Sequence, residues 1–201
     1  MSKKGKFYIL NWVFSYGSAS SNRLLAYANS AAEQGYKVDI VVFLRMELKN
    51  CHPREGVTIR GLKPCRVQNK IFSKLLSFFT TIWFLLTEVK KEDRLLLYGS
   101  AEYLPFLVWF RRRQTYFELT ECPDLFKPKN YPWCYYKRLW KRLNGIFVIS
   151  SNLKKYFVDY GVDSKKIHII NMIVDSSRFE GIKRDPNVEK YIAYCGNVNK
   201  D

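Results

Sequence analysis

The sequence predicts an α/β protein built on a Rossmann-like, mostly parallel β-sheet flanked by helices. Short apolar segments of strand-like composition alternate along the chain with longer segments whose apolar residues recur at helical spacing. The 201 residues are 47% hydrophobic and 16% aromatic, which is enough apolar material for a folded domain with a sizeable core. Neither an internal repeat nor a low-complexity segment interrupts this alternation.

The first strand–helix–strand unit sets the pattern. Phe7–Leu10 is apolar and predicts a short buried strand, and the stretch 11–21, with its glycine and serines, predicts a loop. Asn22–Gln34 predicts a helix with one apolar stripe, and Val38–Leu44 predicts the next strand. Such a unit predicts parallel strands joined by a right-handed crossover.

The remaining elements follow the same alternation. Ser21 or Asn22 can cap the first helix, and Gly35 can end it. Further strands are expected at Val57–Leu62, Arg94–Tyr98, Thr115–Leu119, Ile146–Ile149 and Ile167–Ile170. Further helices are expected at Ile71–Glu88, Glu102–Phe110, Pro132–Leu143 and Asn152–Tyr160.

The end of the chain predicts a change of domain. We expect residues 1–180 to form one Rossmann-like domain and the polar stretch 181–190 to be a linker. Tyr191–Gly196 is again an apolar segment that leads into a glycine, as at the start of a new Rossmann unit. Residues 191–201 therefore predict the first strand of a second domain that is cut short.

Charge and residue usage narrow the function classes. There are 34 Lys and Arg against 18 Asp and Glu, so the formal net charge of +16 favours anionic partners. The five cysteines show no CxxC spacing and the two histidines lie far apart, so we expect reduced thiols and no metal site. The longest apolar run, Leu75–Leu86, is well below the ~20 residues of a spanning helix. We expect a cytoplasmic protein, with peripheral association at the inner face of the plasma membrane as a further expectation.

Four blocks of sequence, in order, carry a resemblance to a known enzyme family. They are the loop after the first strand with Gly35–Val38, then Thr115–Glu121, then Gly145–Leu153 together with Gly161–Phe179, and finally Ile192–Gly196. In the third, GIFVIS followed by Leu153 resembles D-x-x-x-x-V-S-x-x-L, and the residues around Asn171 resemble G-V-x-x-x-K-I-x-V-I-P-N-G-V-D-x-x-x-F. The blocks are similar to glycosyltransferase family four, whose members are retaining enzymes with the GT-B fold.

The resemblance implies a hexosyltransferase that moves a sugar from a nucleotide-diphosphate sugar to a lipid-linked or polysaccharide acceptor. This chain would be the N-terminal, acceptor-side half of the GT-B fold, and alone it would transfer no sugar. The resemblance implies no metal and no further cofactor. The chain departs from the family pattern at Ile170, where Pro is usual, at Met172, where Gly is usual, and at Asn197, where many members have a phosphate-binding Arg.

Two carboxylates are the candidate catalytic groups. Glu118 and Glu121 bracket the end of the Thr115–Leu119 strand, where the family often places a His or an acid near the acceptor. Side chains alternate between the two faces of a strand, so Glu118 is expected on the face opposite Leu119. Burying an unpaired carboxylate among aromatic residues is costly, so Glu118 is expected to have a charged partner or a functional role. Either glutamate could face the acceptor, and the alternative for each is a helix cap or a salt bridge with an arginine.

The remaining candidates are substrate-binding positions. Gly17 lacks a Cβ, so the backbone there can approach a phosphate near a helix N-terminus, although it could equally permit only a tight turn. Ser18, Ser20 and Asn22 could add donors in the same loop. The family blocks add Ser150, Asn171 and Gly196.

Basic and aromatic residues also cluster, at Arg111–Arg113 and at 133–142. Such clusters suit an anionic membrane, and on composition alone they suit RNA equally well. A nucleic-acid-binding α/β domain is therefore the main alternative, but we find no nucleic-acid motif and expect no nucleic-acid partner. A Rossmann oxidoreductase is a second alternative, and it lacks GxGxxG after the first strand, where Gly17 stands alone.

Overall fold

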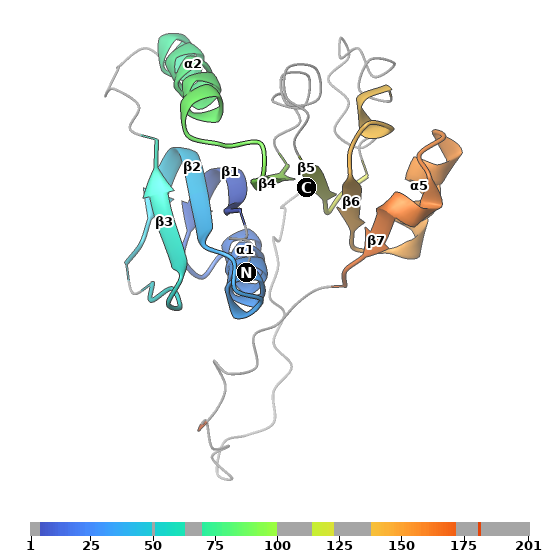
Figure 1. Cartoon of the computed structure of the whole chain (residues 1–201), viewed down its shortest axis with the longest axis horizontal. Coiled ribbons are helices and arrows are strands. Elements are labelled where there is room, and N and C mark those ends of the chain that lie inside the picture. The colour runs from blue at the N-terminus through green and yellow to red at the C-terminus, as the bar shows by residue number, and fades with distance from the viewer. Residues whose placement is uncertain are drawn as a thin grey trace, which may run out of the picture.

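The computed structural model describes residues 5–49, 51–62, 70–99, 114–122, 138–171 and 181. These residues form a seven-stranded sheet in the order β3-β2-β1-β4-β5-β6-β7, in which every neighbouring pair is parallel (Figure 1). The predicted Rossmann-like α/β class is confirmed. The predicted helix Glu102–Phe110, the linker 181–190 apart from Gly181, and the strand Tyr191–Gly196 lie outside the described residues, so the domain division stays a prediction.

The element bounds follow the predicted alternation. The strands are β1 Phe7–Ser15, β2 Val38–Glu47, β3 Val57–Gly61, β4 Arg94–Tyr98, β5 Gln114–Leu119, β6 Gly145–Val148 and β7 Ile167–Ile169. The helices are α1 Ala19–Glu33, α2 Lys70–Thr87 and α5 Ser151–Asp159, with the 3-10 turn η3 Ser164–Lys166 before β7. Of the predicted helix Pro132–Leu143, only residues 138–143 are described, and 138–140 are helical.

The predicted loop at 11–21 is wrong over its first half, because β1 continues to Ser15. The polar side chain of Asn11 is satisfied locally: its amide nitrogen donates to the Val13 carbonyl at 2.6 Å and its oxygen accepts from the Trp12 N–H at 2.9 Å. A register shift between Asn11 and Val13 absorbs the irregularity, and pairing with β2 then resumes as far as Ser15. The helix accordingly starts earlier than predicted, with Ser18 as its cap.

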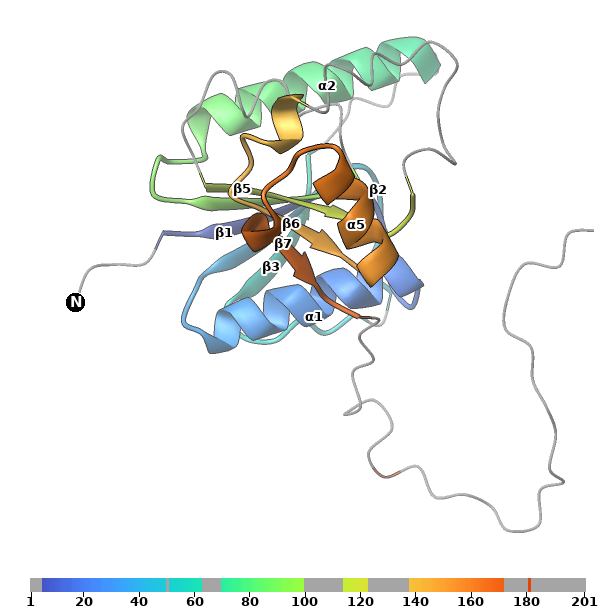
Figure 2. The same cartoon turned by 90° about the vertical axis from the view of Figure 1, so that its right-hand side faces the viewer.

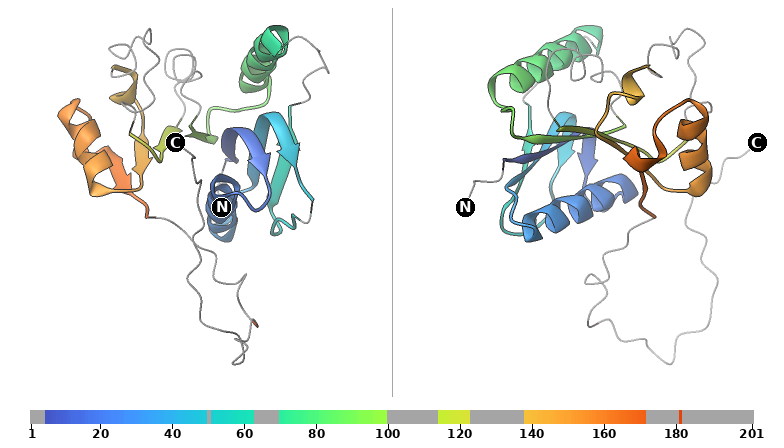
Figure 3. Two further views of the ribbon diagram at one scale, coloured as in Figure 1. Left: turned by 180° about the vertical axis from the view of Figure 1, so that it is seen from behind. Right: turned by 45° about the vertical axis from the view of Figure 1, so that its right-hand side comes forward.

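Helices cover the two faces of the sheet unequally (Figure 2). One face carries α2, the 138–143 segment and α5, which bury Phe84, Trp140 and Phe157 against Leu10, Phe117 and other strand residues. Trp140 and Phe157 meet edge to face with ring centroids 4.8 Å apart. The opposite face is packed by α1 through Leu24 and Ala28. Figure 3 shows α1 and α2 on opposite sides of the sheet.

Candidate functional site at the carboxyl ends of the strands

The parallel topology brings the predicted site residues to one edge of the sheet. Gly17 follows β1, Glu121 follows β5, Ser150 follows β6 and Asn171 follows β7, and all of these strands run in the same direction. In open α/β sheets, ligands bind outside the carboxyl ends of the strands. This edge is therefore the candidate site. Gly196 lies outside the described residues.

A buried ion pair joins α1 to the end of β5. The Arg23 guanidinium donates through Nε to Glu118 Oε1, and both side chains are almost wholly buried. The Tyr27 hydroxyl donates to the same carboxylate oxygen at 2.8 Å. The spacing of Arg23 and Tyr27, one helical turn apart on α1, brings both donors to the same side of the helix. Glu118 points toward α1, and Leu119 packs on the other face of the sheet, so the two side chains lie on opposite faces as predicted.

The same arginine also holds the chain after β7. Its two terminal nitrogens donate to the carbonyls of Ile170 and Asn171, at 2.7 and 2.8 Å. Arg23 thus fastens three segments, the start of α1, the end of β5 and the exit from β7, through one planar group with five N–H donors. Sequence reasoning did not single out Arg23. The available signal was a cation in the first helix, one turn before a tyrosine.

The electrostatics of this network are dominated by burial. Desolvation raises the pKa of Glu118, and the hydrogen bonds from Arg23 and Tyr27 oppose that rise. Burial, followed by the neighbouring charge of Glu118, raises the pKa of Tyr27, so this hydroxyl stays a donor. The second carboxylate oxygen of Glu118 is buried and accepts no hydrogen bond from the described residues. Of the two expectations for Glu118, an acceptor-facing carboxylate or a salt bridge with an arginine, the structure shows the salt bridge. Glu121 is exposed just after the strand end.

In the β1–α1 loop, the predicted donors satisfy the helix start. Gly17 has φ of +90°, a conformation that favours glycine, and open space surrounds the position where a Cβ would stand. The Ser18 oxygen accepts from the Ser21 N–H at 3.2 Å, and the Asn22 amide donates to the Gly17 carbonyl at 3.3 Å. Ser20 Oγ lies 3.3 Å from Ser18 Oγ. Gly17 allows the chain to turn, the Ser18 side chain caps the start of α1, and the Asn22 side chain bonds the Gly17 carbonyl.

The candidates after β6 and β7 also have hydrogen-bond partners, one local and one distant in sequence. Ser150 is the N-cap of α5, and its oxygen accepts from the Leu153 N–H at 3.2 Å. Asn171 contributes its backbone carbonyl to Arg23, and the residue is otherwise exposed. The structure thus brings Glu118 and the Asn171 backbone together through Arg23, and it places Ser150 at a neighbouring strand end.

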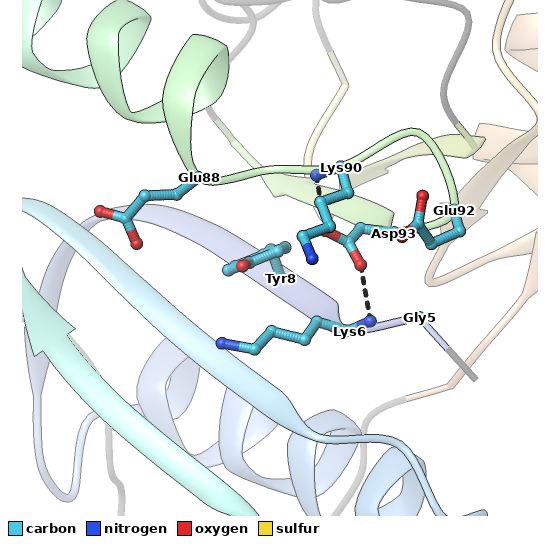
Figure 4. A pocket seen from close by; sticks show the side chains of 7 residues that line it. All are labelled: Gly5, Lys6, Tyr8, Glu88, Lys90, Glu92 and Asp93. Carbon is cyan, nitrogen blue, oxygen red and sulfur yellow. Dashed lines mark hydrogen bonds between the residues drawn. The ribbon is translucent and has the colours of Figure 1, made fainter. Parts of the chain in front are cut away.

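A depression of about 400 Å³ lies at the opposite edge of the sheet, where β1 and β4 begin (Figure 4). Its lining mixes both signs of charge, and the Asp93 carboxylate accepts backbone N–H groups of Lys6 and Lys90 at 2.7 Å each. Burial, followed by the charge of Asp93, raises the pKa of Tyr8 in its wall to about 12. The depression is distant from the carboxyl ends of the strands. Asp93 there joins the segment before β1 to the turn before β4 through these two hydrogen bonds. Its lining residues are Gly5, Lys6, Tyr8, Glu88, Lys90, Glu92 and Asp93.

Within the described ranges, no group of three or more His, Cys, Asp or Glu side chains is placed to bind a metal ion. Among the helices that the structure describes, none combines the length and the apolar character needed to cross a bilayer.

Comparisons with known proteins identify the fold. No protein-family profile and no curated protein sequence matches the chain. Among solved structures, HepE of Anabaena, determined in complex with UDP and glucose, superposes with a TM-score of 0.59 at 13% identity, over 90% of this chain and 47% of that one. The lipopolysaccharide outer core galactosyltransferase WaaB superposes with a TM-score of 0.52 at 8% identity, over 82% of this chain and 44% of that one.

A further glycosyltransferase of lipopolysaccharide biosynthesis, WaaG, gives a TM-score of 0.50 at 8% identity, over 81% of this chain and 44% of WaaG. The chain therefore spans about half the length of the structures it resembles. At these identities the likeness establishes a shared Rossmann-like fold with glycosyltransferases of the GT-B type. No match assigns the chain to family four in particular.

Proposed function

We propose that this chain is the N-terminal, acceptor-side half of a GT-B glycosyltransferase that transfers a hexose from a nucleotide-diphosphate sugar to a lipid-linked or polysaccharide acceptor. One observation carries the proposal. The all-parallel sheet and its helices superpose over 90% of the chain on a protein solved with UDP and glucose. Because the chain spans about half of that structure, the donor would be bound largely by a second Rossmann half. We place the reaction in cell-envelope polysaccharide synthesis, on the cytoplasmic side.

We assign different tasks to the two glutamates. Glu121 is exposed just beyond the end of β5, where its carboxylate can accept a hydrogen bond from an acceptor hydroxyl. Glu118 is buried against Arg23, so its task is to fix the end of β5 and thereby the position of Glu121. This division rests on the exposure of the two side chains.

The remaining candidates would frame the cleft between the two halves. The Gly17 turn and the start of α1 would face the donor diphosphate, with Ser18 and Asn22 beside it. Ser150, Asn171 and Gly196 would line the side from which the donor half approaches.

The chemistry in this proposal is a substitution at the anomeric carbon. The bond from that carbon to the departing nucleoside diphosphate breaks, a bond to the acceptor oxygen forms on the same face, and the acceptor proton passes to a donor phosphate oxygen. Stereochemistry is retained and no metal is required. The chain's contribution is to hold the acceptor hydroxyl close to the anomeric carbon and to stabilise the charge of the leaving diphosphate.

Acceptor binding by the 201-residue chain tests the proposal. Saturation-transfer NMR titrations with envelope-type oligosaccharides should give saccharide signals and a Kd that rises at least about tenfold in Glu121→Gln, the equivalent of about 1.4 kcal/mol. The matched control is Glu92→Gln at the opposite edge of the sheet, which should bind as the native chain does. We expect no turnover of UDP-glucose by this chain alone.

The alternative function, nucleic-acid binding, draws on the net charge of +16. In the same experiment an RNA oligonucleotide replaces the saccharide. Salt-sensitive RNA binding without any saccharide signal would favour that alternative and remove the glycosyltransferase proposal.

A further inference from the structure

Helix α2 presents large apolar side chains to solvent along one stripe. Phe79 and Trp83 are 63% and 69% exposed, although aromatic side chains are on average largely buried in folded proteins. The stripe consists of Phe72, Leu75, Phe79, Trp83 and Leu86, and all five are exposed. These residues recur every three or four positions, so they share one face of the helix over its whole length.

The opposite face of α2 is partly polar and is buried. The Ser77 hydroxyl donates to the Phe43 carbonyl on β2 at 3.2 Å, and the Thr81 hydroxyl donates to the Ser77 carbonyl at 2.7 Å. Phe84 and Leu85 complete the contact with the core. The hydroxyl-bearing side chains therefore face the sheet while larger aromatic side chains face outward. The stripe therefore lies on the face of α2 that points away from the sheet.

Positive charge accompanies the stripe on the same side of the molecule. Residues 138–143 rise from the face of the sheet that α2 covers (Figures 1 and 2), and Arg138, Lys141 and Arg142 in this segment are exposed. The chain as a whole carries a net charge of +16.

We propose that α2 docks on an anionic membrane surface, with its aromatic stripe at the depth of the lipid headgroups and the cations on the same side of the sheet against lipid phosphates. Exposed aromatic side chains bordered by Lys and Arg are the composition of an interfacial helix. The helix lies along the outside of the domain (Figure 2), so its length can rest parallel to a surface. It does not span the bilayer.

Charge selects a membrane over a second copy of the chain as the occupant of the stripe. Two chains of net charge +16 repel each other, whereas an anionic surface attracts each of them. This docking does not depend on the proposed sugar transfer, because it requires neither donor nor acceptor.

Vesicle sedimentation of the 201-residue chain tests the proposal. The chain should sediment with phosphatidylcholine vesicles that contain phosphatidylglycerol, and much less with phosphatidylcholine alone. Binding should fall between about 0.1 M and about 1 M salt, as the Debye length shortens from about 10 Å to about 3 Å. Phe79→Ser and Trp83→Ser should each weaken binding roughly tenfold, because burial of an aromatic side chain is worth a factor of ten or more in an equilibrium constant.

Matched controls separate the stripe and the cations from general effects. Val158→Ser on α5 alters an exposed apolar residue elsewhere and should leave binding unchanged. Arg138→Gln should weaken binding to the anionic vesicles, whereas Lys37→Gln, in the connection between α1 and β2, should weaken it much less. Circular dichroism checks that each variant is folded.

Three results would overturn the proposal. They are absence of binding at low salt, equal binding by the Phe79→Ser/Trp83→Ser double variant, and a concentration-dependent dimer that the same double variant abolishes. The last result would assign the stripe to a second copy of the chain.

Discussion

Replacement of Arg23 by Met is the sharpest test of the network at the strand ends. The substitution keeps an unbranched, flexible side chain, shorter than that of Arg, but removes the charge and every N–H donor. Glu118 is then a buried carboxylate whose cationic partner is gone, and the carbonyls of Ile170 and Asn171 lose their donors. Breaking a buried ion pair on one side destabilises a protein by about 3–5 kcal/mol, a large part of a typical total of about 5–15 kcal/mol.

The loss should be visible in both chemical and thermal unfolding. For a chain of this size, about 3–5 kcal/mol corresponds to a fall in Tm of roughly 6–20 °C. Arg45→Met is the matched control, because Arg45 pairs with Glu47 on an exposed surface. Exposed pairs contribute about 0–1 kcal/mol, so this control should change little.

The pH dependence identifies the cause. Burial already raises the pKa of Glu118, and removal of Arg23 takes away the largest interaction that opposes the rise. A carboxyl with a raised folded pKa loses stability as pH rises from its unfolded pKa, about 4.3, through its folded pKa. The deficit of Arg23→Met should therefore be smallest in acid, where Glu118 is protonated, and reach its full size above the raised pKa. The double variant Arg23→Met/Glu118→Gln should recover part of the stability that Arg23→Met loses at neutral pH.

A loss of less than about 1 kcal/mol in the single variant at neutral pH would contradict this role of Arg23. The same loss of stability at acid and neutral pH would also contradict it, since the Glu118 carboxylate charge would then have no part in the effect.

Three further predictions concern individual contacts, each measured by chemical denaturation. Tyr27→Phe removes a hydrogen bond to the buried carboxylate and should destabilise the fold by about 1.5–3 kcal/mol, and an unchanged midpoint would contradict that bond. Ser150→Ala removes the cap of α5 and should lose about 1 kcal/mol, whereas Ser150→Asp should retain most of it; equal losses would argue against capping. Gly5→Ala places a Cβ against the backbone carbonyl of Glu92 and should lose about 1–3 kcal/mol, and native stability in this variant would mean that the two segments separate readily.

Much of the fold could be predicted because its signals are local. Apolar segments and helical stripes marked each described strand and helix, and their alternation predicted parallel pairing with right-handed crossovers. Where a local signal misled, the reason was also local. Asn11 suggested the end of the first strand, but its amide bonds its own neighbours and the strand continues to Ser15.

The candidate site could be predicted only in part. The edge of the sheet was predictable, because residues that follow parallel strands meet there. The different burial of Glu118 and Glu121 could not be predicted, because the alternation of side chains along a strand gives the face of the sheet and not the depth of burial. Nor could the sequence show that Ser150 and Ser18 cap helices, since a hydroxyl at a helix start suits a cap and a ligand equally.

The sequence by itself determined the α/β class, the order of the elements and the concentration of charged and polar candidates after the strands. Only the tertiary structure decided that Glu118 is buried against Arg23, 95 residues away, and that α2 turns its aromatic stripe outward. The physical reason is the range of the interactions. The periodicity of apolar residues is set by neighbours along the chain. Ion-pair partners and the buried face of a helix are determined only when the sheet assembles and each element meets surfaces from distant parts of the sequence.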